Sequence, residues 1–215
     1  ALLREVYGDP VGALEWLNSA LRLTGVAQTE ERAWILCQIA RVEIGDGKYE
    51  IAAGALDRAD KLFPNYAPAL DQRVELELAR EQFTAAAQAA ERLLAVWPHP
   101  RARYLLARSL HGAGDTARAR DLFREFEKEA VARKDNAWNV NRELILYYAE
   151  FAGRADDAVT LARKEMKRRQ DIWTLQAGAV ALKSAGDVAA AKETLAAAMK
   201  PGTRDQRLQR LAAKL

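Results

Sequence analysis

The sequence predicts an all-α protein built as a solenoid of antiparallel helix pairs, and three observations support this prediction. First, a short pattern recurs along the 215 residues, in which a Gly is followed five residues later by Ala and nine residues later by Leu or Phe. Second, helical spacing of apolar residues precedes and follows these glycines. Third, no run of alternating β-branched residues predicts a strand. Regular repetition of a two-helix unit is typical of stacked repeats.

The recurring pattern has a measurable period. Its clearest copies begin at Gly8, Gly47, Gly114 and Gly186. Two weaker copies fill the gaps, and the alanines of all six are Ala13, Ala52, Ala86, Ala119, Ala158 and Ala191. The intervals between these alanines are 39, 34, 33, 39 and 33 residues. We therefore expect a unit of about 34 residues, with longer inter-repeat turns at 24–31 and 132–140.

Each unit is expected to contain two helices, as the residues around Gly114 show. Residues 101–113 and 116–130 have helical spacing, and apolar residues recur three or four apart in the second range. Gly114 ends the first helix because glycine adopts the left-handed conformation without strain. The acids that follow such glycines are expected N-caps, namely Asp9, Asp115 and Asp187, with Pro10 at the first helical position. The pairs Glu30-Glu31 and Asp156-Asp157 are expected at helix starts, and Pro64 and Pro98 after helix ends.

In chain order, we predict one domain over 1–215. It comprises a partial repeat at 1–23, repeats at about 33–66, 67–99, 100–133, 139–171 and 172–202, and a capping helix at 203–215. Residues 1–7 fit only the tail of a first helix, so we expect the chain to begin inside a repeat of a longer protein. The capping helix places Leu208, Leu211 and Leu215 on one side, with its basic residues mostly elsewhere, and is expected to cover the last apolar face.

These features resemble the tetratricopeptide repeat (TPR) family, in arrays common in bacterial proteins. The second repeat shows the family pattern best, with Ala40, the turn Gly47-Lys48-Tyr49, Ala52, Leu56, Ala59 and Pro64. The third repeat has Glu81 in place of the turn Gly, and the fifth has Leu146 where a small residue is expected. The resemblance covers nearly the whole chain. It implies about 5.5 units stacked as a right-handed superhelix, whose inner wall is lined by the first helix of each pair.

The resemblance also implies which side chains line the inner groove. They are Trp34, Gln38, Arg41, Asp71, Gln72, Glu75, Arg101, Tyr104, Arg108, His111, Glu143, Tyr147, Trp173, Gln176 and Lys183. Aromatic rings and arginines in this mixture suit a partner peptide, because rings supply apolar contact and guanidinium groups bind carboxylates. The alternative for Trp34, Tyr104 and Trp173 is packing between repeats, and for the charged residues a solvated face. The clamp by which some family members hold chaperone C-termini is not expected, since its positions carry Cys37, Arg41 and Gln72.

Other classes of function find little support. His99 and His111 lack metal-ligand spacing, Cys37 has no His near it in sequence, and no phosphate loop or dinucleotide fingerprint is present. We therefore expect no enzyme, cofactor or metal site. A net charge of +3 and the lack of a recurring base-reading pair argue against nucleic acid. No apolar run approaches the roughly 18 residues of a membrane span. No signal peptide is evident, which leaves the cytoplasm and the periplasm of a bacterium both open.

The sequence thus predicts a non-enzymatic scaffold that holds a partner peptide or domain in its groove, as part of a larger bacterial protein or assembly. The alternative is a homo-oligomeric or spacer module with an unoccupied groove. Exposure of Tyr104 and Trp173 favours the first, whereas their burial together with an apolar patch elsewhere favours the second. A third hypothesis is a ligand sensor in which Arg41, Arg108 and Glu75 converge.

Overall fold

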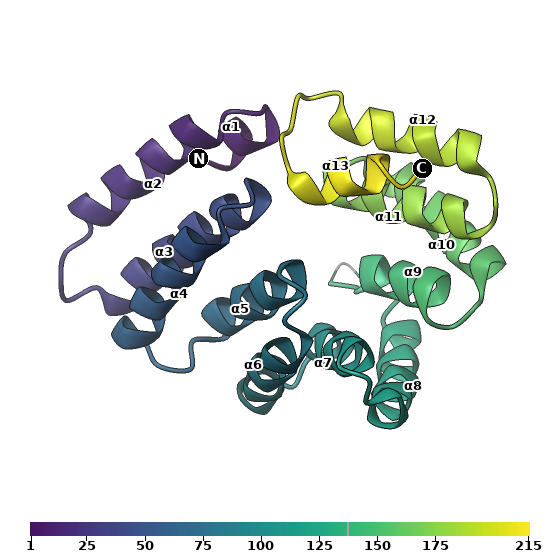
Figure 1. The fold of residues 1–215 in the computed structure, drawn as a ribbon, viewed down its shortest axis with the longest axis horizontal. Helices are drawn as coiled ribbons and strands as arrows, with labels where there is room; N and C mark the ends of the chain where they lie inside the picture. The colour runs from purple at the N-terminus through teal and green to yellow at the C-terminus, as the bar shows by residue number, and fades with distance from the viewer. Residues whose placement is uncertain (137) are drawn as a thin grey trace. The chain divides into compact units, whose positions relative to one another are not determined.

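The computed structural model describes residues 1–136 and 138–215, and within them all regular structure is α-helical (Figure 1). The helices are α1 (Leu2–Val6), α2 (Pro10–Leu23), α3 (Thr29–Gly45), α4 (Tyr49–Leu62), α5 (Ala67–Ala79), α6 (Phe83–Val96), α7 (Pro100–Gly112), α8 (Thr116–Ala132), α9 (Asn141–Glu150), α10 (Ala155–Arg168), α11 (Ile172–Ser184), α12 (Val188–Met199) and α13 (Gln206–Ala212). They pack pairwise in sequence, so the predicted all-α solenoid class is confirmed. Among these helices, none combines the length and the apolarity that crossing a lipid bilayer demands.

The chain divides into two compact units, Ala1–Glu125 and Phe126–Leu215, and the division falls inside α8. In unit 1, α3 packs against α2, α4 and α5, and α5 packs against α6 and α7. In unit 2, α11 packs against α9, α10 and α12, and α12 contacts α13. The repeat boundaries, the single domain over 1–215 and the right-handed superhelical sense stay predictions.

Buried alanines hold the helices of each pair close together. The alanine of every copy of the pattern is at most 1% exposed, namely Ala13, Ala52, Ala86 and Ala119 in unit 1 and Ala158 and Ala191 in unit 2. Larger apolar side chains surround them, with Leu36, Leu56 and Leu93 fully buried in unit 1. A methyl group at the closest approach of two helices allows this dense packing.

The turns within the pairs also follow the pattern. Gly47 and Gly114 have φ values of 77° and 90°, in the left-handed region. The caps at the helix starts form as expected, with Asp9 Oδ1 accepting from the Gly12 N–H at 2.8 Å and Asp187 Oδ1 from the Ala190 N–H at 3.1 Å. Small side-chain caps of this kind contribute about 1 kcal/mol each.

Glu81 takes the place of a turn glycine with the same backbone geometry. Its φ is 60°, and its N–H donates to the Leu78 carbonyl at 3.2 Å, while the Gln82 N–H donates to the Glu77 carbonyl at 2.8 Å. These two bonds form the Schellman motif that closes α5. A glutamate therefore occupies a conformation that glycine adopts without strain.

Two sequence expectations need correction. The turn predicted at 24–31 is too long, because α3 begins at Thr29 and places Glu30 and Glu31 in its first turn, where carboxylates favour the helix dipole. Ala137, within the turn predicted at 132–140, lies outside the described residues. The C-terminal helix buries Leu208 as expected, but Arg207 is half-buried, because its side chain turns inward onto an aromatic ring described below.

Candidate functional site

The first helices of unit 1, α3, α5 and α7, carry most of the predicted groove residues. Nine of these side chains are exposed or half-buried, and we call them the first-helix surface: Trp34, Gln38, Arg41, Asp71, Gln72, Glu75, Arg101, Arg108 and His111. Because α5 packs against both α3 and α7, residues from three successive repeats come together in one unit.

An ion-pair network organises the part of this surface formed by α5 and α7. Arg101 of α7 binds Asp71 through two nitrogens, with Nε 2.9 Å from Oδ1 and Nη2 3.2 Å from Oδ2. The same Nη2 donates to Glu75 Oε1 at 2.9 Å. All three side chains are partly shielded from solvent, which makes a bidentate pair stronger than a fully exposed one. The network therefore holds polar groups of adjacent repeats in one arrangement.

A second pair links α1 to α3. Arg41 Nη2 lies 2.6 Å from Glu5 Oε2, and Arg41 Nη1 donates to Glu5 Oε1 at 3.0 Å. Arg41 Nε also donates to Gln38 Oε1 at 3.2 Å. Arg41 and Glu75 thus have separate partners, Glu5 and Arg101. The hypothesis that they converge with Arg108 on a small ligand stays a prediction without support from these contacts.

The aromatic residues predicted for the groove differ in exposure. Trp34 is 47% exposed near the start of α3. Tyr104 is only 2% exposed, because its ring packs against Phe123 with the centroids 6.1 Å apart. Of the two alternatives left open for these rings, packing therefore applies to Tyr104, whereas Trp34 presents apolar surface to solvent.

In unit 2, two predicted groove residues of α9 are also buried. Tyr147 packs edge-on against Phe126, with ring centroids 6.0 Å apart, and Glu143 is buried beside it on the same helix. Neither position was expected to be covered. The helix α9 packs against both α10 and α11, and Phe126 covers Tyr147, so these two positions, which the family resemblance assigned to an open groove, are closed.

Trp173 of unit 2 is half-buried between two guanidinium groups. The Arg142 guanidinium lies 5.3 Å from the centroid of the Trp173 ring, and that of Arg207 lies 4.3 Å from it. Arg207 in turn donates to both oxygens of Asp205, at 3.0 and 2.6 Å. Cation–π contacts of this kind anchor α13 on α11 and leave only part of the ring accessible. Gln176 and Lys183, further along α11, are half-buried.

The start of α11 is fixed by Asp171. Its Oδ1 accepts from the N–H groups of Trp173 and Thr174, each at 3.1 Å, and its Oδ2 accepts from the Thr174 hydroxyl at 2.7 Å. Partial burial raises the pKa of this carboxyl, but the hydrogen bonds from Thr174 outweigh it, so the pKa lies below its usual value. The cap therefore holds the helix that carries Trp173.

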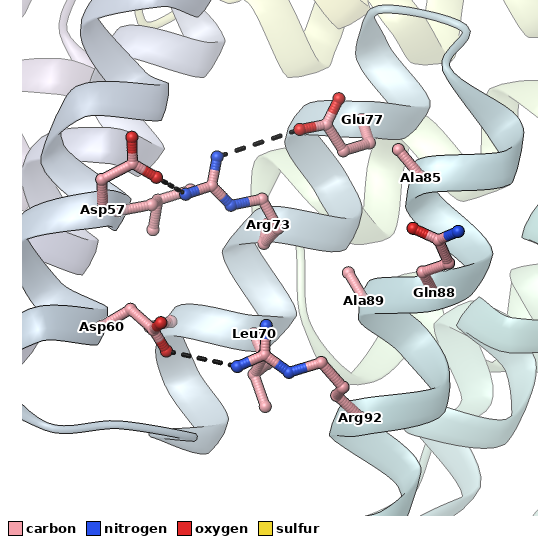
Figure 2. A pocket seen from close by; sticks show the side chains of 11 residues that line it. Asp57, Asp60, Leu70, Arg73, Glu77, Ala85, Gln88, Ala89 and Arg92 are labelled. Carbon is pink, nitrogen blue, oxygen red and sulfur yellow. Dashed lines mark hydrogen bonds and ion pairs between the residues drawn. The ribbon is translucent and has the colours of Figure 1, made fainter.

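The structure also contains a hollow that the sequence reasoning missed. It has a volume of about 350 Å³ and lies between α4, α5 and α6 (Figure 2). Its lining residues are Leu56, Asp57, Asp60, Ala69, Leu70, Arg73, Glu77, Ala85, Gln88, Ala89 and Arg92. Arg73 stands where the neighbouring repeats carry Ile39 and Leu106, 34 residues before and 33 residues after it. Arg73, a charged residue at an otherwise apolar position of the repeat, is the feature of the sequence that could have indicated the hollow.

Cys37 and His99, to which the sequence analysis assigned no catalytic role, pack against other parts of the fold. Burial raises the pKa of the Cys37 thiol to about 12, and the side chain is fully buried. His99 stacks on Trp97 with the ring centroids 4.2 Å apart, and its Nδ1 accepts from the Arg101 N–H at 3.2 Å at the start of α7. Within 1–136 and 138–215, no group of three or more His, Cys, Asp or Glu side chains is arranged to hold a metal ion.

Comparison with known proteins shows similarity in structure rather than in sequence. No protein-family model matches the chain, and no curated protein sequence matches it. It is similar to TTC0263, a thermophilic TPR protein in Thermus thermophilus, at 18% identity and a TM-score of 0.63, over 85% of this chain and 97% of that one. It is also similar to YrrB, a TPR protein with an unusual peptide-binding site, at 17% identity and a TM-score of 0.48, over 93% and 98% of the two chains. MamA from Desulfovibrio magneticus matches at 19% identity and a TM-score of 0.47, over 93% of each chain.

Proposed function

The chain has the fold of tetratricopeptide repeat proteins, and on that premise we propose that it is a non-enzymatic scaffold that binds a partner peptide on the first-helix surface of unit 1. Proteins of this fold are generally protein–protein interaction scaffolds. The partner is an extended or helical segment of another protein within a larger assembly, since stacked helices offer a continuous row of side chains rather than an enclosed pocket.

The observation that supports this proposal is the ordered polar network on α5 and α7. Arg101 holds Asp71 and Glu75 in place before any partner arrives, so binding does not have to order these side chains. A carboxylate oxygen can accept more than one hydrogen bond, so these acids can also receive donors from a peptide backbone or from a basic side chain. Prior ordering of this kind favours recognition over a purely structural role.

Trp34 is the apolar contact point of the same surface. Nearly half of its surface is accessible on α3, next to Gln38, one turn further along the helix. Tryptophan and arginine are enriched among the residues that dominate binding energy in protein interfaces. We therefore assign the main apolar contact to Trp34 and the main polar contacts to Arg108 and the Asp71–Arg101–Glu75 network.

A capture experiment tests the proposal. The chain is immobilised, exposed to a lysate of its source organism, and compared with the Trp34→Ala and Arg108→Glu variants. Both variants should lose the same bound protein, because each removes one kind of contact from the first-helix surface. The Arg120→Glu variant reverses an exposed charge on α8 and serves as the matched control, which should keep the partner. Tyr104 is unsuitable for this test, because truncating a buried ring disturbs the core.

The outcome has two readings. Loss in Trp34→Ala and Arg108→Glu together with retention in Arg120→Glu supports the first-helix surface. Retention of the partner in both test variants places the interaction elsewhere on the molecule and refutes the assignment. Circular dichroism of all variants shows that they remain folded.

Self-association is the second candidate, and two observations favour it: the burial of Tyr104 and the exposed apolar side chains of the N-terminal helices. Exposed apolar side chains are frequent on α1 and α2, where Leu3 is 74% exposed, Trp16 61% and Leu23 87%. Single exposed apolar residues are common, but several in one short stretch are typical of contact surfaces. Sedimentation equilibrium should then show a concentration-dependent dimer that Trp16→Glu abolishes. A monomer at every concentration excludes this candidate.

A further inference from the structure

We propose that one edge of unit 2 binds the surface of an anionic phospholipid membrane, with Trp138 at the level of the headgroups and the surrounding cations on the phosphates. We call it the basic edge, and it consists of residues 133–136, Trp138 and residues 163–168. It belongs to unit 2, whereas the first-helix surface belongs to unit 1, so this interaction is additional to the proposed peptide binding. Three observations lead to it: the placement of the two segments, their charge, and the exposed ring.

The side chain of Asn141 holds the two segments of the basic edge together. It is fully buried, and its Nδ2 donates to the Lys134 carbonyl at 2.7 Å and to Glu165 Oε1 at 2.9 Å. Lys164 Nζ of α10 also donates to Asp135 Oδ1 at 2.8 Å. The residues that follow α8 therefore lie beside the second half of α10.

The basic edge carries more positive charge than the whole chain. Its two segments contain six cations and two carboxylates, a net charge of +4, against +3 for all 215 residues. The cations are Arg133, Lys134, Arg163, Lys164, Lys167 and Arg168. The hydrogen bond from Lys164, with the nearby charges of Lys134 and Arg168, lowers the pKa of the Asp135 carboxyl. These three cations therefore lie close enough together to act on one acid.

Helix electrostatics explain only part of this charge. Lys167 and Arg168 lie in the last turn of α10, where cations stabilise the helix dipole, and Arg168 also pairs with Glu165 at 3.1 Å. Arg163 lies more than one turn before the end of α10, and Lys134 lies beyond the end of α8. Within the described part of the chain, Lys134, Arg163 and Lys167 are exposed and form no ion pair. Their charges are therefore available to an anionic partner.

Trp138 supplies the apolar part of the basic edge. It lies in the turn between α8 and α9 and is 87% exposed, which makes it the most exposed of the five tryptophans. The turn is held by Asn139, whose Nδ2 donates to the Asn136 carbonyl at 2.7 Å and whose Oδ1 accepts from the Asn141 N–H at 3.1 Å. An exposed indole bordered by Lys and Arg is typical of membrane-surface contacts, because the ring favours the headgroup region and the cations bind anionic lipids. A purely acidic protein segment would pair with the cations but leave the ring in water, so a lipid surface accounts for both features.

Cosedimentation of the full chain with lipid vesicles tests the proposal. Vesicles of phosphatidylcholine and phosphatidylglycerol in equal amounts should bind the chain, and binding should weaken as the salt concentration rises. Vesicles of phosphatidylcholine alone should not bind it. When the lipids of the anionic vesicles carry bromine on their acyl chains, they should quench the tryptophan fluorescence of the original chain more than that of Trp138→Ala. Absence of binding to the anionic vesicles, or equal binding to both kinds of vesicle, refutes the proposal.

Variants identify the groups that contact the lipid. Lys167→Gln removes one cation and should weaken binding to the anionic vesicles about fivefold, and Trp138→Ala should weaken it about tenfold. Asp135→Asn removes an acid and releases Lys164, so it should strengthen binding about fivefold. Lys192→Gln is the matched control, because Lys192 is exposed on α12 of the same unit and lies outside the basic edge. Unchanged affinity in both Lys167→Gln and Asp135→Asn, with the helical signal preserved, refutes the site.

Soluble polyanions show whether a different partner uses the same edge. Polyglutamate and an oligouridylate are titrated against the chain under the same salt conditions. If either binds the chain when the anionic vesicles do not, and Lys167→Gln weakens that binding, the edge recognises a soluble acidic chain and the membrane proposal is wrong. If the vesicles bind and neither polyanion does, the lipid surface is supported. None of these variants alters Trp34 or Arg108, so this proposal and the proposed peptide binding fail separately.

Discussion

Replacing Glu81 with glycine should stabilise the protein, because Glu81 ends α5 in a left-handed conformation with φ 60°. This conformation costs a residue with a Cβ atom about 1–2 kcal/mol. Glycine removes that cost but loses about 0.5–1 kcal/mol more backbone entropy on folding. The side chain of Glu81 is exposed, so little packing is lost with it. The free energy of unfolding should therefore rise by about 0.5–1 kcal/mol.

Thermal unfolding followed by circular dichroism measures this change. For a chain of this size a gain of 1 kcal/mol raises the melting temperature by about 2–4 °C, so Glu81→Gly should melt about 1–4 °C higher. Gly114→Ala is the reciprocal control. Gly114 has φ 90°, and a Cβ added there would have no atom within 4 Å, so the substitution strains the backbone without creating a steric clash. A Glu81→Gly variant that melts at or below the original temperature, while Gly114→Ala melts lower, refutes the reasoning.

Three further predictions follow from local geometry. Asp171→Ala should lower the free energy of unfolding by about 1 kcal/mol through loss of the α11 cap. Because the pKa of Asp171 lies below its usual 3.8, this difference should persist above that pH and shrink as the pH falls through the folded-state pKa, and urea titrations at several pH values test it. Cys37, with a pKa of about 12, should react with an aromatic disulfide reagent only after unfolding, and prompt reaction of the native chain at pH 8 contradicts its burial. Gly112→Ala should destabilise by about 1–3 kcal/mol, since the new Cβ would lie 2.3 Å from the Phe83 ring. Gly54→Ala, with open space around its Cβ, should stabilise by about 0.5–1 kcal/mol, and equal melting shifts for these two glycine variants argue against the contact.

The sequence was sufficient for the fold class because the repeat pattern encodes short-range geometry. A Gly that ends one helix, an Asp that caps the next and an Ala at their closest approach act within a few residues of one another. Gly47, Asp9 and Ala52 show each of these roles in the structure. The turn predicted at 24–31 was too long because it included Glu30 and Glu31, which were also expected at a helix start and lie in the first turn of α3.

The candidate site was less predictable, because exposure depends on neighbouring helices. Helical spacing identifies the side of a helix on which a residue lies, but it does not show what covers that side. Tyr104 and Trp34 were assigned to the same surface, yet Phe123 covers Tyr104, whereas Trp34 is exposed to solvent. In unit 2, Phe126 similarly covers Tyr147.

The hollow was missed for a different reason. It requires a charged residue on α5, acids on α4 and small residues on α6 to meet, and no single helix shows the combination. Arg73 departs from the apolar residues at the equivalent positions of both neighbouring repeats, and Ala89 is smaller than Leu122 of the following repeat although it matches Ala55 of the preceding one. Each departure looks minor on its own. Aligning the repeats of one chain against each other would have brought them together.

Because one guanidinium group, that of Arg101, pairs with two acids, the link between α5 and α7 tolerates substitution of either acid better than substitution of the arginine. Either Asp71 or Glu75 can be neutralised while the other acid still holds Arg101, whereas replacing Arg101 breaks both ion pairs at once. Redundancy on the acidic side means that single neutral substitutions there will understate the importance of the pair. The contribution of the two acids to the free energy of unfolding is measured in full only when both are replaced in the same variant.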